Sequence, residues 1–464
     1  MIMAGKRNLR YYGSLWFAKG TAGVLKLIGR KGTSMPGSWA IILCSDFIGR
    51  MPKPKKIFCV TGTNGKTTVA NMVEDILEKK GVDFICNREG SNVPTGLAST
   101  LIAGSTFFGK PKKDFAMFEV DERSSLRVFP NMKPDVLAIT NIFRDSFKRN
   151  AHTEFICGIL EKNIPDETKL IINADDPQSQ ALKKNNKRVY FGIDRLSFED
   201  KETHNIVRDG AYCPNCHTEL TYDFTRYHHI GKFHCEKCGY KNPTPEYRVL
   251  AADTEKNILH TEIKGEKVDM KLLSPLPINI YNQILAIAIL SEYGLSNEEI
   301  KKAFDGQQID KSRLSEKKAA GKTFIRHLAK GQNPVACSRA MENTKNMAGN
   351  KGVVLYLDDH FDAASSVENT AWLYDTDFEF LNDDSIKQIL VGGARHEDVH
   401  LRLLLAGVPE EKIVHCEDNM KVLEKADMKK CDTFVVFYDV YTIGLSNDAE
   451  KYLIEKAEKE ANNG

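Results

Sequence analysis

The sequence predicts an α/β fold, and three observations support that prediction. Short apolar runs of strand type alternate with helical patterns, an order typical of parallel sheets covered by helices on both faces. A glycine-rich turn joins the first strand, at residues 57–61, to the next helix. Two Cys-x-x-Cys pairs interrupt the alternation at about residues 209–245. A charged stretch at residues 310–318 then divides the alternation into two domains.

The domain boundaries follow from these interruptions. We expect a helical N-terminal segment at residues 1–50, a central domain at 51–312 that contains the cysteine-rich insert, and a smaller Rossmann-like α/β domain at 313–464. Strands are predicted at residues 57–61, 115–120, 136–141, 170–173, 189–192, 247–252, 258–263, 268–273, 323–328, 352–357, 388–391, 412–415 and 433–437. Helices are predicted at residues 69–80, 280–293 and 397–406, among others.

The composition excludes some classes of protein. The 464 residues are 42% hydrophobic, enough for two or three domains with sizeable cores. The 65 basic and 63 acidic residues leave a net charge of +2, so no global field favours nucleic acid as a partner. No secretory signal is visible, and we expect a cytoplasmic protein whose cysteines are reduced.

The N-terminal segment allows two interpretations. Basic residues alternate with aromatic and aliphatic residues over the first 31 positions. The longest apolar run, 40–44, is far shorter than the roughly 20 residues that a membrane span needs. The segment either packs on the body of the protein or forms a basic, aromatic surface that touches the inner face of a membrane.

The glycine-rich turn has the residues of a phosphate-binding loop. Such a loop needs converging backbone N–H groups, a cation that reaches the phosphates, and a hydroxyl for Mg²⁺. Lys66 would neutralise the γ-phosphate, and the Thr67 hydroxyl would bind Mg²⁺. Val60 stands where the general pattern has its first glycine, and Gly62 supplies the turn instead. The predicted nucleotide-binding residues are Gly62, Thr63, Asn64, Gly65, Lys66, Thr67 and Thr68.

The cysteine pairs have the spacing of a zinc ribbon. Eighteen residues separate Cys213-Pro-Asn-Cys216 from Cys235-Glu-Lys-Cys238. Four thiolates in two turns fit a tetrahedral Zn²⁺ site. Because four sulfurs leave no open position for water, we expect a structural metal that supplies most of the folding energy of the insert.

Several acidic and amide residues extend the nucleotide site. Glu119, in the sequence Phe-Glu-Val-Asp-Glu, stands at a predicted strand end; Asn141 ends the next predicted strand and Asp145 follows it. Asn279 and Asn282 precede an alanine-rich helix. With the sequence Thr-Gly-Thr-Asn-Gly-Lys-Thr-Thr, these segments resemble the Mur ligase family, the ATP-dependent ligases that build the peptidoglycan stem peptide. The resemblance implies that Glu119 binds Mg²⁺ and acts in catalysis with Lys66. It also implies that Asn141, Asn279 and Asn282 contact the nucleotide.

One branch of that family is similar over almost the whole chain. The predicted zinc ribbon within the ATPase domain resembles that of the MurT-type subunit of lipid II isoglutaminyl synthase. The segments at residues 32–37 and 372–379 also resemble parts of that subunit. The resemblance implies a P-loop parallel-sheet ATPase domain with an inserted Cys₄ ribbon and a Rossmann-like C-terminal domain. It further implies that ATP activates the D-glutamate α-carboxylate of lipid II as an acyl phosphate. Ammonia from a GatD-type glutaminase subunit, bound in a heterodimer, would then give D-isoglutamine.

The C-terminal domain departs from that branch before Trp372. The branch has aspartates where this chain has Ser366 and Asn369, and Asp362 and Glu368 are the nearby carboxylates. We therefore name Asp362 and Asn369 as candidate catalytic residues. Three hypotheses remain open: an amidating subunit with a shifted acid, a similar ligase for another peptide or amine, and a nucleotide-binding partner or regulatory subunit without catalysis.

Overall fold

The computed structural model describes residues 7–88, 91–145, 152–197, 199, 205–307, 314–329, 333–358, 369–439 and 441–463. These residues form two compact units. The first unit contains the described residues of 7–143, 153–199 and 209–307. The second contains those of 144–152, 205–208 and 314–463. The α/β class predicted from the sequence is confirmed in both units.

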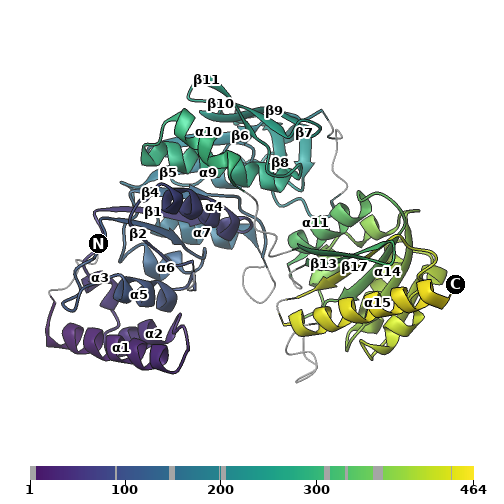
Figure 1. Cartoon of the computed structure of the whole chain (residues 1–464). Helices are drawn as coiled ribbons and strands as arrows, with labels where there is room; N and C mark the ends of the chain where they lie inside the picture. The colour runs from purple at the N-terminus through teal and green to yellow at the C-terminus, as the bar shows by residue number, and fades with distance from the viewer. Residues whose placement is uncertain are drawn as a thin grey trace. The chain divides into compact units, whose positions relative to one another are not determined.

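A nine-stranded sheet organises the first unit (Figure 1). Its strand order is β11-β10-β9-β6-β5-β4-β1-β3-β2. All neighbouring pairs from β9 to β2 are parallel, and β10 pairs antiparallel with both β9 and β11. The strands are β1 (Lys56–Thr61), β2 (Phe84–Cys86), β3 (Phe115–Glu119), β4 (Val136–Ile139), β5 (Lys169–Asn173), β6 (Arg188–Ile193), β9 (Tyr247–Asp253), β10 (Ile258–Ile263) and β11 (Glu266–Lys271).

Helices cover both faces of this sheet. Alternate residues of β1 point to opposite faces, as the period of a strand requires. Ile57 and Cys59 join a core that contains residues of α5, α6 and α7, whereas the Phe58 ring contacts Tyr293 of α9. The helices of this unit after the N-terminal segment are α4 (Lys66–Lys79), α5 (Pro94–Ala103), α6 (Ser125–Val128), α7 (Thr153–Asn163), α8 (Pro177–Gln180), α9 (Pro277–Tyr293) and α10 (Asn297–Asp305).

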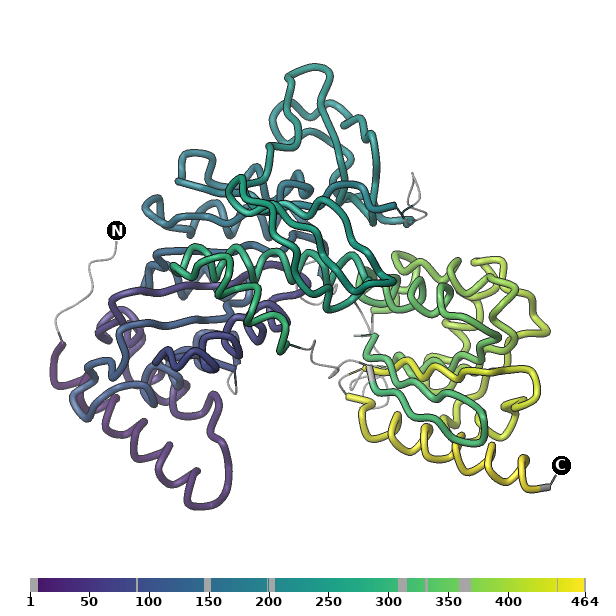
Figure 2. Tube along the Cα trace, turned by 45° about the horizontal axis from the view of Figure 1, so that its top comes forward, coloured from purple at the N-terminus to yellow at the C-terminus, as the bar shows by residue number. Residues whose placement is uncertain are grey.

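The N-terminal segment packs on the first unit. It forms α1 (Leu9–Leu27), α2 (Met35–Leu43) and α3 (Phe47–Arg50), and the views in Figures 1 and 2 show α1 and α2 side by side. Tyr11 and Leu15 are fully buried in the core that also contains Phe47. A Cβ at Gly37 would lie 2.0 Å from the Thr95 carbonyl oxygen, so α2 can approach α5 this closely only with glycine. None of the described helices combines the length and hydropathy that crossing a bilayer would require.

The cysteine-rich insert forms a separate two-stranded sheet. Strands β7 (Thr221–Tyr227) and β8 (Ile230–His234) are antiparallel, and the cysteine pairs lie before and after them. Its small core contains Leu220 and Phe233 with the cysteines. So few apolar side chains supply little stabilisation of their own.

The second unit is built on a six-stranded sheet in the order β12-β13-β17-β14-β15-β16. All neighbouring pairs are parallel except β12 with β13. Val353 and Leu355 enter the core on one face, and Val354 and Tyr356 enter the core on the other. The strands are β12 (Leu314–Ala319), β13 (Lys322–Leu328), β14 (Lys351–Tyr356), β15 (Ile386–Gly392), β16 (Ile413–Cys416) and β17 (Thr433–Tyr438). The helices are α11 (Pro334–Lys345), α13 (Trp372–Asp375), η2 (Phe378–Leu381), α14 (His396–Leu405), η3 (Glu410–Lys412), η4 (Lys421–Lys425) and α15 (Ile443–Asn463).

One element of this sheet differs from the sequence-based expectation. No strand was expected in the charged stretch at 310–318, yet its residues from Leu314 onward form β12 at the sheet edge. Lys317 pairs with the buried Glu450 at 2.5 Å. Charged side chains are typical of an edge strand, where they discourage pairing with another chain.

Candidate nucleotide site and metal-binding insert

Two glycines fix the shape of the phosphate-binding loop between β1 and α4. Gly62 and Gly65 have φ values of 120° and 94°, in the region that favours glycine. A Cβ at Gly62 would lie 2.2 Å from the Thr140 hydroxyl oxygen, and one at Gly65 would lie 2.2 Å from Asn282 Oδ1. Side chains are therefore excluded from both positions, and the backbone N–H groups at the start of α4 remain accessible to an anion.

The chain after β4 holds this loop from one side. Asn141 is 2% exposed, and its Oδ1 accepts from the Asn64 N–H at 3.0 Å while its Nδ2 donates to the Asn64 carbonyl at 3.0 Å. The Thr63 N–H donates to the Asn141 carbonyl at 2.9 Å. The Thr63 hydroxyl bonds both the N–H and the carbonyl of Phe143, at 3.0 and 3.1 Å. These bonds join residues about 80 positions apart, so the loop geometry is set by the fold.

Lys66 lies in a buried ion pair that the sequence did not reveal. Its Nζ is 2.9 Å from Glu122 Oε2, and it also donates to the carbonyl oxygens of Gly62 and Thr63. Burial alone would lower the pKa of Lys66, but the charge of Glu122 raises it above its ordinary value. The ammonium group is therefore charged and held at the mouth of the loop. Glu122 stands three residues after Glu119 in the acidic segment, and that proximity was the one available signal.

Thr67 and Glu119 line the same pocket. The pocket has a volume of about 190 Å³ and is also lined by Asn87, Asn92 and Glu74. Asn92 Nδ2 donates to Glu119 Oε1 at 3.0 Å, and the Glu119 N–H donates to Asn87 Oδ1 at 2.9 Å. A hydroxyl and a carboxylate are oxygen ligands of the kind that Mg²⁺ prefers. The two residues predicted to bind Mg²⁺ thus fit such an ion.

The same pocket contains a second carboxylate that the sequence did not single out. Glu74 is 1% exposed, and burial raises the pKa of its carboxyl to about 7, although Arg88 opposes the rise. Arg88 Nε donates to Glu74 Oε2 at 2.8 Å, and its Nη2 donates to Asp75 Oδ1 at 2.6 Å. A buried, partly protonated acid beside Thr67 gives this pocket a charge that changes near neutral pH.

Asn279 and Asn282 lie on the first two turns of α9. Asn282 is 4% exposed, and its amide occupies the space that a Cβ at Gly65 would need. Asn279 Nδ2 donates to the Ser274 hydroxyl at 3.0 Å. The structure therefore brings Asn282 to the phosphate loop. Asn279 stands one turn earlier on the same helix.

The four insert cysteines converge. Cys213 Sγ lies 3.5 Å from Cys238 Sγ, Cys216 Sγ lies 3.5 Å from Cys235 Sγ, and all four sulfurs lie within 4.8 Å of one another. Sulfurs at about 2.3 Å from a tetrahedral zinc ion would be about 3.8 Å apart. The cluster thus fits Zn²⁺. Gly239, with φ of 72°, makes a tight turn directly after the second pair.

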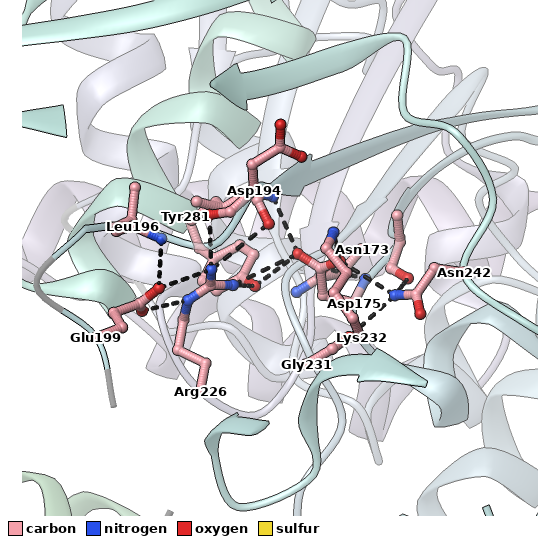
Figure 3. A network of polar contacts seen from close by, with 12 residues as sticks. Asn173, Asp175, Asp194, Leu196, Glu199, Arg226, Gly231, Lys232, Asn242 and Tyr281 are labelled. Atoms are coloured by element: carbon pink, nitrogen blue, oxygen red, sulfur yellow. Dashed lines mark hydrogen bonds and ion pairs between the residues drawn. The ribbon is translucent and has the colours of Figure 1, made fainter. Parts of the chain in front are cut away.

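A buried polar network joins the insert to the end of β5 (Figure 3). Asp175 is fully buried, and its Oδ1 pairs with Lys232 Nζ of β8 at 2.6 Å. Its Oδ2 accepts from the Tyr281 hydroxyl at 2.7 Å and lies 3.6 Å from Arg226 Nη1. Arg226, on β7, also pairs with Glu199 Oε1 at 2.5 Å. Because Tyr281 immediately precedes Asn282 on α9, this network connects the insert to the helix that borders the phosphate loop.

The predicted catalytic residues of the second unit are less well defined. Asn369 is exposed, and its Oδ1 accepts from the Ala371 N–H at 2.9 Å, a local turn contact. Asp362, Ser366 and Glu368 lie outside the described residues. In the segment after Trp372, Asp377 is buried and accepts from Asn205 Nδ2 at 2.7 Å.

Strand-end contacts order another part of the second unit. Arg144 Nη1 is 2.7 Å from Asp375 Oδ2. Asn333 caps α11 and donates to Asp145 at 2.8 Å, so Asp145 contacts a neighbour within its own unit. Together with the bond from Asn205 to Asp377, these contacts hold segments 144–145 and 205–208 against helical elements of the second unit.

Comparisons with known proteins match this arrangement. The sequence profile of the Mur ligase middle domain matches residues 60–290, and that of the MurT ligase C-terminal domain matches residues 330–443. The lipid II isoglutaminyl synthase (glutamine-hydrolyzing) subunit MurT of Staphylococcus aureus strain COL is 31% identical over 442 residues, 95% of each chain. The subunit of the same name from Streptococcus pneumoniae strain R6 is 30% identical over 88% of this chain and 90% of its own length.

Solved structures of lower identity share the fold. A pseudomurein peptide ligase type C from Methanothermus fervidus has a TM-score of 0.66 and 21% identity, and the match covers 89% of this chain and 81% of that one. MurF from Acinetobacter baumannii has a TM-score of 0.61 and 15% identity over 90% of this chain and 80% of its own.

Proposed function

This chain belongs to the MurT family of Mur ligases, as its motifs predicted, and we propose that it amidates the stem peptide of lipid II. It is an ATP-dependent ligase that forms a C–N bond. The observation that carries the proposal is the pocket lined by Thr67 and Glu119 at the start of α4, the helix that begins with the charged Lys66. Cation, hydroxyl and carboxylate are the groups that a phosphoryl transfer needs.

In the proposed reaction, an oxygen of the D-glutamate α-carboxylate attacks the γ-phosphorus of ATP. The bond to the β–γ bridging oxygen breaks, so ADP leaves and an acyl phosphate forms. Ammonia then attacks the acyl carbon, phosphate leaves with its carboxyl-derived oxygen, and the nitrogen loses a proton. The chain has to position the reactants and stabilise charge, and needs no covalent nucleophile of its own.

The described residues have distinct parts in this reaction. Lys66 Nζ lies at the loop mouth, where it would exchange its contacts with Glu122 for phosphate oxygens. Thr67 and Glu119 would hold Mg²⁺, which when bound spreads the negative charge of the phosphates. Asn141 keeps the loop backbone in place through two hydrogen bonds. The backbone N–H groups from Gly62 to Thr68 would bind the phosphates, and Asn279 and Asn282 would contact the nucleotide from α9, with Asn282 beside the phosphate loop.

The four cysteines would hold a structural Zn²⁺. Four thiolates fill its coordination, so the metal's part is to fold the insert. Through Arg226 and Lys232, the folded insert then supports Asp175, which accepts a hydrogen bond from Tyr281 of α9.

Ammonia requires a source, and we propose a GatD-type glutaminase subunit that forms a heterodimer with this chain. The support is the identity to subunits of a glutamine-hydrolyzing synthase over 95% of the chain. Co-expression of the two subunits should yield a complex that amidates lipid II with glutamine as the source of ammonia. Amidation with ammonium alone, and none with glutamine plus the partner, would argue against the heterodimer.

A lipid-linked substrate lies at a membrane surface. We propose that the N-terminal helices contact this membrane surface from the cytoplasmic side. Phe17, Val24 and Leu27 of α1 are 51%, 60% and 88% exposed, and Trp39 of α2 stacks edge-on to Phe17 at 5.7 Å. Exposed aromatic and aliphatic side chains on one surface are typical of interfacial helices. The parent chain should co-sediment with anionic vesicles, whereas the Phe17→Ser/Leu27→Ser variant should stay in the supernatant. Equal sedimentation of the parent chain and the variant would contradict the membrane contact.

A second candidate is a related ligase for another carboxylate or amine. The feature that favours it is Asn369, which has an amide where the resemblance to the family implies an aspartate. An amide cannot accept a proton or carry the charge of a carboxylate. Asn369→Asp should raise lipid II amidation if this position faces the acceptor, and an unchanged rate would assign the acid to another residue.

The direct test mixes the purified chain with lipid II, ATP, Mg²⁺ and ammonium. We expect stoichiometric ADP and a product whose mass falls by the exchange of a carboxyl OH for NH₂. Fragmentation should place the amide on the α-carboxyl of D-glutamate. ATP turnover with a different acceptor would favour the second candidate, and nucleotide binding without turnover on any muropeptide would leave a regulatory subunit.

A further inference from the structure

The second unit contains a cluster of imidazole and carboxylate groups remote in sequence from the cysteine insert. His396 and Glu397 begin α14, and His415 lies on β16. His396 Nδ1 is 2.9 Å from His415 Nδ1. Glu397 Oε1 is 3.8 Å from the first of these nitrogens and 3.9 Å from the second. Three donor atoms from two elements therefore face a common point.

The geometry of this triangle points to a ligand. We propose that His396, His415 and Glu397 form a second metal site, for a divalent first-row transition ion such as Zn²⁺. A triangle with sides of 2.9, 3.8 and 3.9 Å has a centre about 2.1 Å from each corner, which matches zinc–imidazole and zinc–carboxylate bond lengths. Two nitrogens and one oxygen favour zinc, cobalt, nickel or copper over Mg²⁺ and Ca²⁺, which prefer oxygen alone.

A hydrogen bond between the two rings is the simpler explanation of their contact. One Nδ1–H donating to the other Nδ1 accounts for a distance of 2.9 Å. It does not account for a carboxylate oxygen almost equidistant from both nitrogens. A cation in the centre accounts for all three distances.

A fourth residue orders the cluster. His400 stands one helical turn after His396, on the same face of α14. Its ring stacks on His415 with centroids 4.0 Å apart and planes at 18°. His400 Nε2 is 3.1 Å from each carboxylate oxygen of Glu410, which fixes the ring orientation. Contacts of this kind around metal ligands set their orientation, and Glu410 adds negative charge near the site.

The proposed site differs from the cysteine cluster in its openness. The His396 and His415 side chains are 18% and 24% exposed, and that of Glu397 is 73% exposed. Three protein ligands leave a position for water, whereas four thiolates leave none. A bound ion would also link α14 to β16, and should therefore raise the Tm of the second unit.

Metal stoichiometry of the full chain tests the proposal. After equilibrium dialysis at micromolar zinc, we expect two Zn²⁺ ions per parent chain. We expect one ion per chain in each of the single variants His396→Ala and His415→Ala. His260→Ala is the matched control, because His260 pairs with Asp269 at 2.7 Å and that pair contains one imidazole and one carboxylate. It should retain two ions. Cobalt titration separates the sites, since only the cysteine cluster gives thiolate charge-transfer absorption.

One bound ion in the parent chain would overturn the proposal, as would two ions in both histidine variants. If a histidine variant loses secondary structure, Glu397→Gln still provides the test, because its exposed side chain tolerates substitution. That variant should bind the second ion at least about tenfold more weakly. Unchanged affinity in Glu397→Gln would exclude the carboxylate from the site.

Discussion

Two asparagines distinguish the two units of this protein. Asn141 of the first unit is buried, and its amide bonds both backbone groups of Asn64, 77 positions away in the chain. Asn369 of the second unit is exposed, and its side chain bonds the N–H two residues later. The first amide fixes a distant loop, whereas the second shapes only its own turn.

This difference shows how the proposed reaction is divided. The phosphate side is built from buried contacts between strand ends, so its geometry is present before any substrate binds. Preorganised groups of this kind cost no rearrangement when charge develops. At Asn369, which we propose for the acceptor side, the side chain is exposed and has only a local turn contact of this kind. We therefore expect substitutions on the phosphate side to have the larger effects.

Lys66→Ala should have the largest effect. Its loss removes the charged donor from the loop mouth, and removal of one such group typically lowers kcat by about 10²-fold or more. ATP turnover, measured as ADP release, should fall accordingly. Lys80→Ala is the matched control, because Lys80 is the C-cap residue of the same helix and pairs with the exposed Glu299. Equal activity of the two variants would remove the phosphate-loop assignment.

Arg226→Leu should have the largest effect on stability. The substitution leaves Asp175 and Glu199 without a buried cationic partner that both now contact. Breaking such a pair costs about 3–5 kcal/mol. Urea unfolding followed by Tyr fluorescence should report the loss, and Arg248→Leu, which removes a half-exposed pair with Asp194, should cost less. Similar costs for both variants would show that the network in Figure 3 does not support the insert.

Glu74 should make stability depend on pH. Burial raises the pKa of its carboxyl from 4.5 to about 7. Between these two pH values the folded chain retains a proton that the unfolded chain has released. The contribution of this carboxyl to the free energy of unfolding is therefore fully present below pH 4.5 and is lost as pH rises to about 7. The loss from this group is at most about 3 kcal/mol. Glu74→Gln should flatten the dependence of the unfolding midpoint, and the same slope in the variant would assign it elsewhere.

Asn141→Ala and Asn369→Ala test the comparison itself. The first leaves the Asn64 backbone groups unpaired and should cost about 1–3 kcal/mol. It should also raise the KM for ATP. The second changes an exposed turn and should cost less than about 0.5 kcal/mol. Equal costs in thermal unfolding would mean that the two amides do not differ as their contacts indicate.

The sequence was informative where a site is local. The glycines of the phosphate loop and the four cysteines stand within short motifs, so spacing predicted their convergence. Glu122, Arg226 and the cluster of His396 and His415 depend on contacts between elements distant in sequence, and spacing carried no such information. Strand β12, in the charged stretch at 310–318, was not predicted because an edge strand and a linker have similar composition. Asp362 was named from sequence and stays a prediction.

The most direct measurement follows an oxygen atom. Lipid II labelled with ¹⁸O in the D-glutamate α-carboxylate is incubated with the chain, ATP, Mg²⁺ and ammonium. An acyl phosphate transfers one carboxylate oxygen to phosphate as ammonia attacks. We therefore predict one ¹⁸O in the inorganic phosphate for each amide formed. Amide formation with unlabelled phosphate would contradict activation of this carboxylate by phosphoryl transfer.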